Sequence, residues 1–322
     1  MDEESGKMRD VEAYLKSERP PLYAFTPDGA YPVVNTEKGT IKFTSTAVFE
    51  TAPVKGISLA KICGGESIGS VPARAEAVLK GEIQALERTA SAVAAEAKRN
   101  GWKTKIAASG DHLTITVHGK AAHATLPELG ENAVGRLLIL LSATEINGGA
   151  GKFVRFLADK IGVEADGCSL GIKASHAHLL DESSTGTWTV SKHDDSITVT
   201  CGIYIPAETI SFDSVCETLE QSFSFAGGSF EPFAKTAPLY YSPEHPLIKT
   251  LQRGYHNATG KEPYLVSMCG GTYSKRMPNM VPYGATFENE DDRAHGANER
   301  LLITNLMEST RLMAYAILEM AK

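Results

Sequence analysis

The pattern of hydrophobic and polar positions predicts a series of β-strands. Residues 41–50 alternate cleanly, with Ile41 and Phe43 on one side and Lys42 and Thr44 on the other. This period of two indicates a half-buried strand of the kind found in antiparallel sheets. Similar patterns predict further strands, the last two as a hairpin, over residues 31–34, 113–117, 187–190 and 196–204.

Apolar residues spaced by three and four positions predict helices elsewhere. The helix expected over 81–99 ends at Asn100 and Gly101, a suitable C-cap. The last helix carries one apolar stripe, made of Leu306, Met313, Ile317 and Met320. Other helices are expected over 9–16, 132–144, 212–223 and 247–259. Strands and helices mixed in this way predict an α/β protein.

Composition excludes several classes of protein. A chain of 322 residues exceeds the usual single domain, so two domains are expected. The net charge of −7 argues against a nucleic-acid or anionic-membrane surface, and no segment is apolar for long enough to span a bilayer. The five cysteines are widely spaced and contain no C-x-x-C pair, which favours a reducing cytoplasm over a disulfide framework.

Candidate chemistry begins at the acidic N-terminal segment. Glu3 and Glu4 are adjacent carboxylates, and such a pair can divide labour when one binds a cation and the other acts as a base. The helix dipole explains two acidic residues near a helix start more simply. Asp28 lies in a Pro-Asp-Gly turn, and it precedes a strand that would hold a carboxylate ligand rigidly.

Three later segments also contain suggestive residues. His123 is flanked by alanines and lies between a strand and a helix, so its position is well fixed. The Gly270 and Gly271 turn allows backbone N–H groups and a basic side chain to meet an anionic group. His295, in a polar loop, can serve as a metal ligand with Glu299 as its orienting partner.

Taken together and in this order, the segments resemble one family. They read E-E-S-G, T-P-D-x-x-Y-P, G-K-A-A-H-A-x-x-P, G-G-T-Y and A-H-G-x-N-E. The set is similar to the zinc dipeptidases and amidohydrolases that include carnosinase, aminoacylase and the bacterial Xaa-His dipeptidases. The long-lidded bacterial dipeptidase is the most similar of these, and the likeness extends from residue 2 to the C-terminal helix.

The resemblance implies a site for two zinc ions. Glu3 resembles the general base that deprotonates the water between the metals, Glu4 would bind one zinc together with His295, and Asp28 would bind the other. Family members also carry an H-x-D motif well upstream of the E-E pair, whereas one residue precedes Asp2 here. The H-x-D at 193–195 is interpreted as a solvated hairpin tip.

These departures lead to an expectation about activity. A catalytic zinc normally has three protein ligands, so we expect an N-terminally truncated chain whose metal site is incomplete. Such a chain would bind zinc weakly and have little peptidase activity. The alternatives are an inactive remnant or peptide-binding paralogue, and an N-acyl amino-acid deacylase on the same scaffold.

The resemblance also implies how a small peptide substrate would bind. His123 resembles the lid histidine that stabilises the tetrahedral oxyanion. The segment that would grip the C-terminal carboxylate of the substrate contains Gly270, Gly271, Thr272 and Lys275. Relatives usually have arginine at the last of these positions, and Arg276 next to it is a substitute. The preferred dipeptide, and the choice between zinc and manganese, stay open.

The architecture implied is an α/β fold in which a mixed-sheet catalytic domain is interrupted by a large α+β lid. The catalytic domain would comprise residues 1–39 and 243–322, and the lid residues 40–242. A lid of this length implies a monomer. Association through the catalytic sheet, exposed by the missing block, is a second expectation. Nucleic-acid and membrane partners are not expected.

Overall fold

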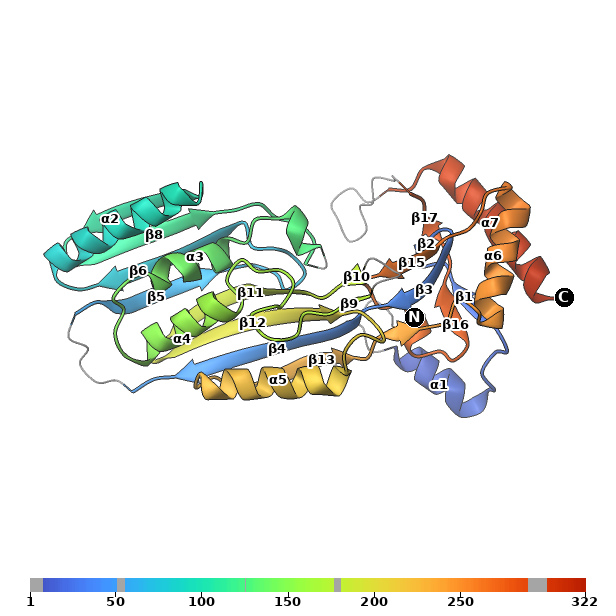
Figure 1. Ribbon diagram of the computed structural model, residues 1–322, viewed down its shortest axis with the longest axis horizontal. Helices are drawn as coiled ribbons and strands as arrows, with labels where there is room; N and C mark the ends of the chain where they lie inside the picture. The colour runs from blue at the N-terminus through green and yellow to red at the C-terminus, as the bar shows by residue number, and fades with distance from the viewer. Residues whose placement is uncertain (1–7, 51–55, 125, 177–180, 289–299) are drawn as a thin grey trace.

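The structure is a computed structural model that describes residues 8–50, 56–124, 126–176, 181–288 and 300–322. Its chain forms a larger part built on a long sheet and a smaller part that contains the first and the last described helices (Figure 1). The α/β class is confirmed, because helices cover a large sheet and a set of small sheets. No helix in the described part of the chain combines the length and apolarity needed to cross a bilayer.

The larger part is built on an eight-stranded antiparallel sheet with the order β13-β4-β12-β11-β5-β6-β8-β7. Its strands are β4 (Gly39–Val48), β5 (Ser58–Gly64), β6 (Arg74–Lys80), β7 (Lys103–Ser109), β8 (His112–His118), β11 (Ser184–His193), β12 (Ser196–Ile205) and β13 (Glu231–Thr236). The alternation predicted for residues 41–50 is confirmed, because buried and half-buried residues alternate along β4. The predicted hairpin is confirmed as β11 and β12, with its turn at Asp194.

Four helices pack on this sheet: α2 (Ile83–Arg99), α3 (Ala133–Ser142), α4 (Gly148–Lys160) and α5 (Phe212–Phe225). The C-cap expected after α2 is confirmed, and the structure adds an N-cap before α3. Gly101 follows α2 with a φ of 67°, and the Asn132 side chain accepts a hydrogen bond from the Gly135 N–H at 2.9 Å. The buried residues of these helices and of the strands form one core cluster, whose members all come from residues 41–223.

The smaller part joins N-terminal strands to C-terminal ones. β1 (Ala24–Thr26) pairs with β16 (Met280–Pro282), β2 (Gly29–Ala30) pairs with β17 (Ala285–Thr286), and β3 (Val33–Glu37) lies between β14 (Leu239–Tyr240) and β15 (Leu265–Met268). Its helices are α1 (Arg9–Ser17), α6 (Pro246–Thr259), α7 (Ile303–Met320) and the short 3-10 helix η2 (Tyr273–Lys275). A second 3-10 helix, η1 (Pro127–Leu129), belongs to the larger part. β9 (Ser175–His176) and β10 (Asp181–Glu182) form a separate short hairpin.

The stripe predicted for the last helix is wrong in part, because Met320 packs against the core of the smaller part but two of the other members do not. Leu306 is 50% exposed and Ile317 is 57% exposed, whereas α7 buries the face that carries Leu312 and Ala316. The close approach of α6 explains the difference, because a Cβ on Gly254 would lie 3.1 Å from the Ala316 Cα. The close contact therefore requires a small residue at Ala316, and Leu312 on the same face is buried with it.

The chain passes between the two parts at two places that touch each other. One passage leads from β3 through Lys38 into β4, and the other leads from β13 to β14. A Cβ on Gly39 would lie 2.8 Å from the Pro238 Cδ, so the two passages are in contact. The second core cluster comes from the smaller part, with buried members between Tyr31 and Ala316. The division into catalytic and lid domains stays a prediction.

Candidate functional site

The proposed metal ligands are only partly within the described residues. Glu3, Glu4 and His295 lie outside them. Asp28 is exposed in the tight connection between β1 and β2, as its Pro-Asp-Gly sequence predicts. The connection is closely packed, because a Cβ on Gly29 would lie 2.5 Å from the Pro282 Cβ. Asp28 is therefore a carboxylate on a rigid support, next to the pair of strands β2 and β17.

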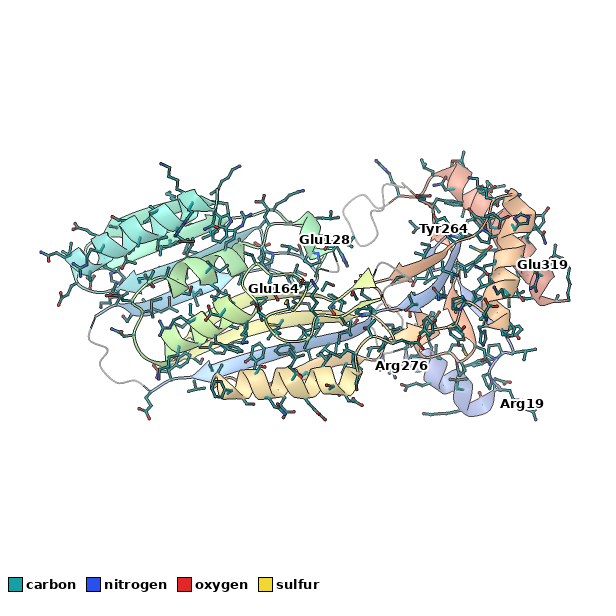
Figure 2. The ribbon with its side chains drawn as sticks, viewed as in Figure 1. Arg19, Glu128, Glu164, Tyr264, Arg276 and Glu319 are labelled. Carbon is teal, nitrogen blue, oxygen red and sulfur yellow. The ribbon has the colours of Figure 1, made fainter. Side chains whose placement is uncertain are left out.

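His123 is exposed in a loop whose backbone is fixed on both sides. The Ala124 N–H donates to the Gly69 carbonyl at 2.9 Å, and the Val71 N–H donates to the Ala122 carbonyl at 2.9 Å. The loop leads into η1, and Figure 2 shows Glu128 of η1 at the end of the larger part that faces the smaller part. The backbone position of His123 is therefore fixed, as its place between a strand and a helix predicts, and its role stays a prediction.

Trp188 supports the His123 loop and was not foreseen from the sequence. Its side chain is fully buried and clusters with Val71 and Ala124. The indole lies over two glycines of neighbouring strands, because a Cβ on Gly186 or on Gly202 would come within 2.3 Å of ring atoms. A β-bulge in β11 between Thr187 and Thr189 accompanies this position. The sequence did offer a sign of this packing: Gly186 lies two residues before Trp188, and Gly202 lies on the next strand.

The segment predicted to bind a carboxylate forms a turn between β15 and η2. Gly270 and Gly271 are exposed, and Thr272 is buried. The Thr272 side chain caps η2 by accepting a hydrogen bond from the Ser274 N–H at 3.2 Å. The Lys275 ammonium donates to the Lys38 carbonyl, so it already has a partner. Arg276 is exposed, and Figure 2 shows it where the smaller part approaches the larger one.

Glu37, at the end of β3, is the second residue that sequence reasoning missed. Its side chain is fully buried, and its Oε1 accepts a hydrogen bond from the Thr272 N–H at 3.0 Å. Burial raises the pKa of Glu37 to about 7, although the charge of Lys275 and the bonds from Thr272 oppose that shift and Asp28 adds to it. Burial lowers the pKa of Lys275 to about 8, against the effect of Glu37.

The described residues do not by themselves supply a metal site. Among residues 8–50, 56–124, 126–176, 181–288 and 300–322, no group of three His, Cys, Asp or Glu side chains could hold an ion. The H-x-D at 193–195 lies in the turn between β11 and β12, as interpreted from the sequence. Whether the metal site of this chain is incomplete stays a prediction, since Glu4 and His295 lie outside the described residues.

Comparisons with known proteins place the chain in a family. No family model matches it. It is 31% identical, over 100% of its length and 68% of the relative's, to a Bacillus subtilis protein named "Putative dipeptidase YtjP". It is 26% identical, over 97% of its length and 65% of the relative's, to the "Beta-Ala-Xaa dipeptidase" of Lactobacillus delbrueckii subsp. lactis. The chain thus spans about two thirds of the length of these relatives.

The chain belongs to this dipeptidase family, which confirms the resemblance drawn from its motifs. Among solved structures, it is similar to the aminoacylhistidine dipeptidase of Vibrio alginolyticus, at 13% identity over 92% of this chain and 65% of that one. The TM-score of that comparison is 0.49.

Proposed function

We propose that this protein is a metal-dependent dipeptidase that hydrolyses short peptides with a free C-terminus. The observation that carries the proposal is the 31% identity to a dipeptidase-family protein along the whole chain. The exposed His123 on its fixed loop, together with the exposed Gly270 and Gly271 turn, supports it. The five free cysteines favour a reducing compartment such as the cytoplasm.

The proposed chemistry divides the roles among residues of both parts. Asp28, Glu4 and His295 would hold the metal, which when bound lowers the pKa of water to the neutral range. Glu3 would accept the proton from the attacking water. His123 would donate a hydrogen bond to the oxygen on which negative charge develops.

The substrate carboxylate is proposed to meet the turn at Gly270 and Gly271. Thr272 already donates its N–H to Glu37, and the Lys275 ammonium already donates to a carbonyl. The backbone of the two exposed glycines is therefore the part of the segment that we assign to the carboxylate. Lys275 would contribute its positive charge through space, and Arg276 is the nearby exposed cation.

The test is hydrolysis of a panel of dipeptides by the purified chain, with zinc, with manganese and with a chelator. The panel includes β-alanyl dipeptides and N-acyl amino acids. We expect His123→Gln to lower kcat by about a hundredfold to a thousandfold, because a positioned oxyanion donor is worth about 3 kcal/mol. The matched control is His118→Gln, an exposed histidine at the end of β8, which should leave kcat unchanged.

Three other results of the dipeptide panel would contradict part or all of the proposed function. Cleavage of N-acyl amino acids in preference to dipeptides would make the protein a deacylase. Metal-independent cleavage would contradict the proposed metal dependence. Absence of hydrolysis with either metal would contradict the dipeptidase proposal for this chain.

A further inference from the structure

Glu37 places a carboxylate where the chain leaves the smaller part. It is the last residue of β3, and Lys38 and Gly39 after it lead into β4 of the large sheet. The side chain of Glu37 is 0% exposed. Among the described residues, its Oε2 has no hydrogen-bond partner. A buried carboxylate costs free energy, so its presence at this passage calls for a reason beyond packing.

The passage and the 268–275 segment are joined by three bonds. The Glu37 carboxylate accepts from the Thr272 N–H at 3.0 Å, and the Lys275 ammonium donates to the Lys38 carbonyl. The Lys38 N–H donates to the Met268 carbonyl at 2.8 Å. In the first two bonds each segment offers a side chain to the backbone of the other. We call Glu37, Lys38, Thr272 and Lys275 the reciprocal clamp.

The reciprocal clamp fixes one end of the glycine turn. Gly270 and Gly271 are exposed, and neither has a side chain that could anchor the turn. Next to Gly271, the Thr272 N–H is held by a buried acceptor, and the Thr272 side chain caps η2. The direction of the two glycine peptides therefore depends on where Glu37 places the Thr272 backbone.

We propose that Glu37 is a positioning residue for substrate binding. Its carboxylate oxygen holds the Thr272 backbone so that the peptides of Gly270 and Gly271 point toward the carboxylate of the substrate. The inference rests on the proposed function, which assigns that turn to the substrate. The proposal requires a hydrogen-bond acceptor opposite the Thr272 N–H, and it does not require a charge. The amide oxygen of a glutamine at position 37 can therefore take the place of the carboxylate oxygen.

The test compares Glu37→Ala with Glu37→Gln. The alanine variant removes the acceptor. We expect KM for a dipeptide to rise about tenfold, the factor expected for losing a hydrogen bond, and kcat to change by no more than about twofold. The glutamine variant keeps an oxygen acceptor and should retain the KM of the wild type. Glu76→Ala is the control, since Glu76 pairs with Lys61 and Arg74 on the large sheet and should leave KM unchanged.

Amide hydrogen exchange supplies a readout that needs no turnover. Exchange of the Thr272 N–H should be about tenfold faster in Glu37→Ala and should return to the wild-type rate in Glu37→Gln. Unchanged exchange in the alanine variant would overturn the inference. Faster exchange with unchanged KM would also overturn it, because the clamp would then not position the substrate. A thermal unfolding curve separates these results from failure to fold.

The failure of the proposed function has a different signature. In that case the wild-type chain neither hydrolyses nor binds a dipeptide, with binding measured by calorimetry in the presence of chelator. The exchange result would still report whether Glu37 holds Thr272. If the wild-type chain does not bind a dipeptide, the glycine turn does not bind the substrate carboxylate, and the inference about Glu37 is overturned as well.

Discussion

The carboxyl group of Glu37 titrates in an unusual range because burial disfavours its charged form. Its pKa is raised from 4.5 to about 7. Lys275 and the Thr272 bonds act in the opposite direction, and Asp28 reinforces the rise. Between these two pKa values the folded chain binds more protons at this site than the unfolded chain does. The contribution of Glu37 to stability is therefore present in full below pH 4.5 and is lost as the pH rises to 7.

We expect the Glu37→Gln variant to lose this pH dependence. A shift of this size corresponds to about 3 kcal/mol in the free energy of unfolding, as an upper bound. Urea denaturation at pH 5 and at pH 7.5 measures it as the difference between wild type and variant, which cancels the titrating groups that do not interact with Glu37. Lys275 has its pKa lowered to about 8, so its own titration adds to the change measured at pH 7.5. Equal pH dependence in both proteins would contradict the expectation.

The residues that the sequence singled out, Asp28 and His123, are marked by their immediate neighbours in the chain. Asp28 lies in a local turn signal, and His123 lies between small residues after a strand. The environment of Glu37 is created by Thr272, 235 residues away in sequence, whose backbone reaches it only in the folded chain. The local sequence Asn-Thr-Glu-Lys is polar and gives no sign that the glutamate is buried.

At the scale of elements, strand periodicity was a better guide than the apolar stripe of the last helix. Register along β4 follows directly from its alternation, because one face of the sheet is buried. The orientation of α7 instead depends on how closely α6 approaches, and Gly254 sets that distance. The sequence of one helix does not show which element packs against it, so the buried face of α7 could not be predicted from its apolar stripe alone.

The glycines under Trp188 give a prediction for the β11 and β12 pair. A Cβ on Gly202 would lie 2.3 Å from the Trp188 Nε1, and the rigid indole is fully buried. We expect Gly202→Ala to lower the free energy of unfolding by about 2 kcal/mol through overpacking. Chemical denaturation measures the loss.

Two further variants test the cause of that loss. Gly69→Ala is the control, because the nearest atom to its added Cβ is 3.6 Å away, which is ordinary contact. In a Trp188→Leu background, Gly202→Ala should cost much less than in the wild type, since the ring it meets is gone. Equal cost in both backgrounds would show that the indole is not responsible.

At the scale of the whole molecule, the two core clusters share no part of the chain. The buried residues of the large cluster come from 41–223, and those of the small one come from 31–33 and 247–316. The chain passes between them twice, and the two passages are in contact at Gly39 and Pro238. A segment whose ends meet and whose core is its own has the properties of an inserted domain.

We therefore expect residues 39–237, expressed alone, to fold. This fragment keeps all eight strands of the large sheet and the four helices that pack on it, so the apolar surface that drives folding stays buried. Circular dichroism should show a cooperative thermal transition, and near-ultraviolet spectra should report Trp188 in a fixed environment. The matched control begins at residue 49 and lacks β4, which lies between β13 and β12, and it should not fold cooperatively. A fragment 39–237 without a cooperative transition would mean that the larger part depends on the smaller one, and that the predicted lid is not a domain.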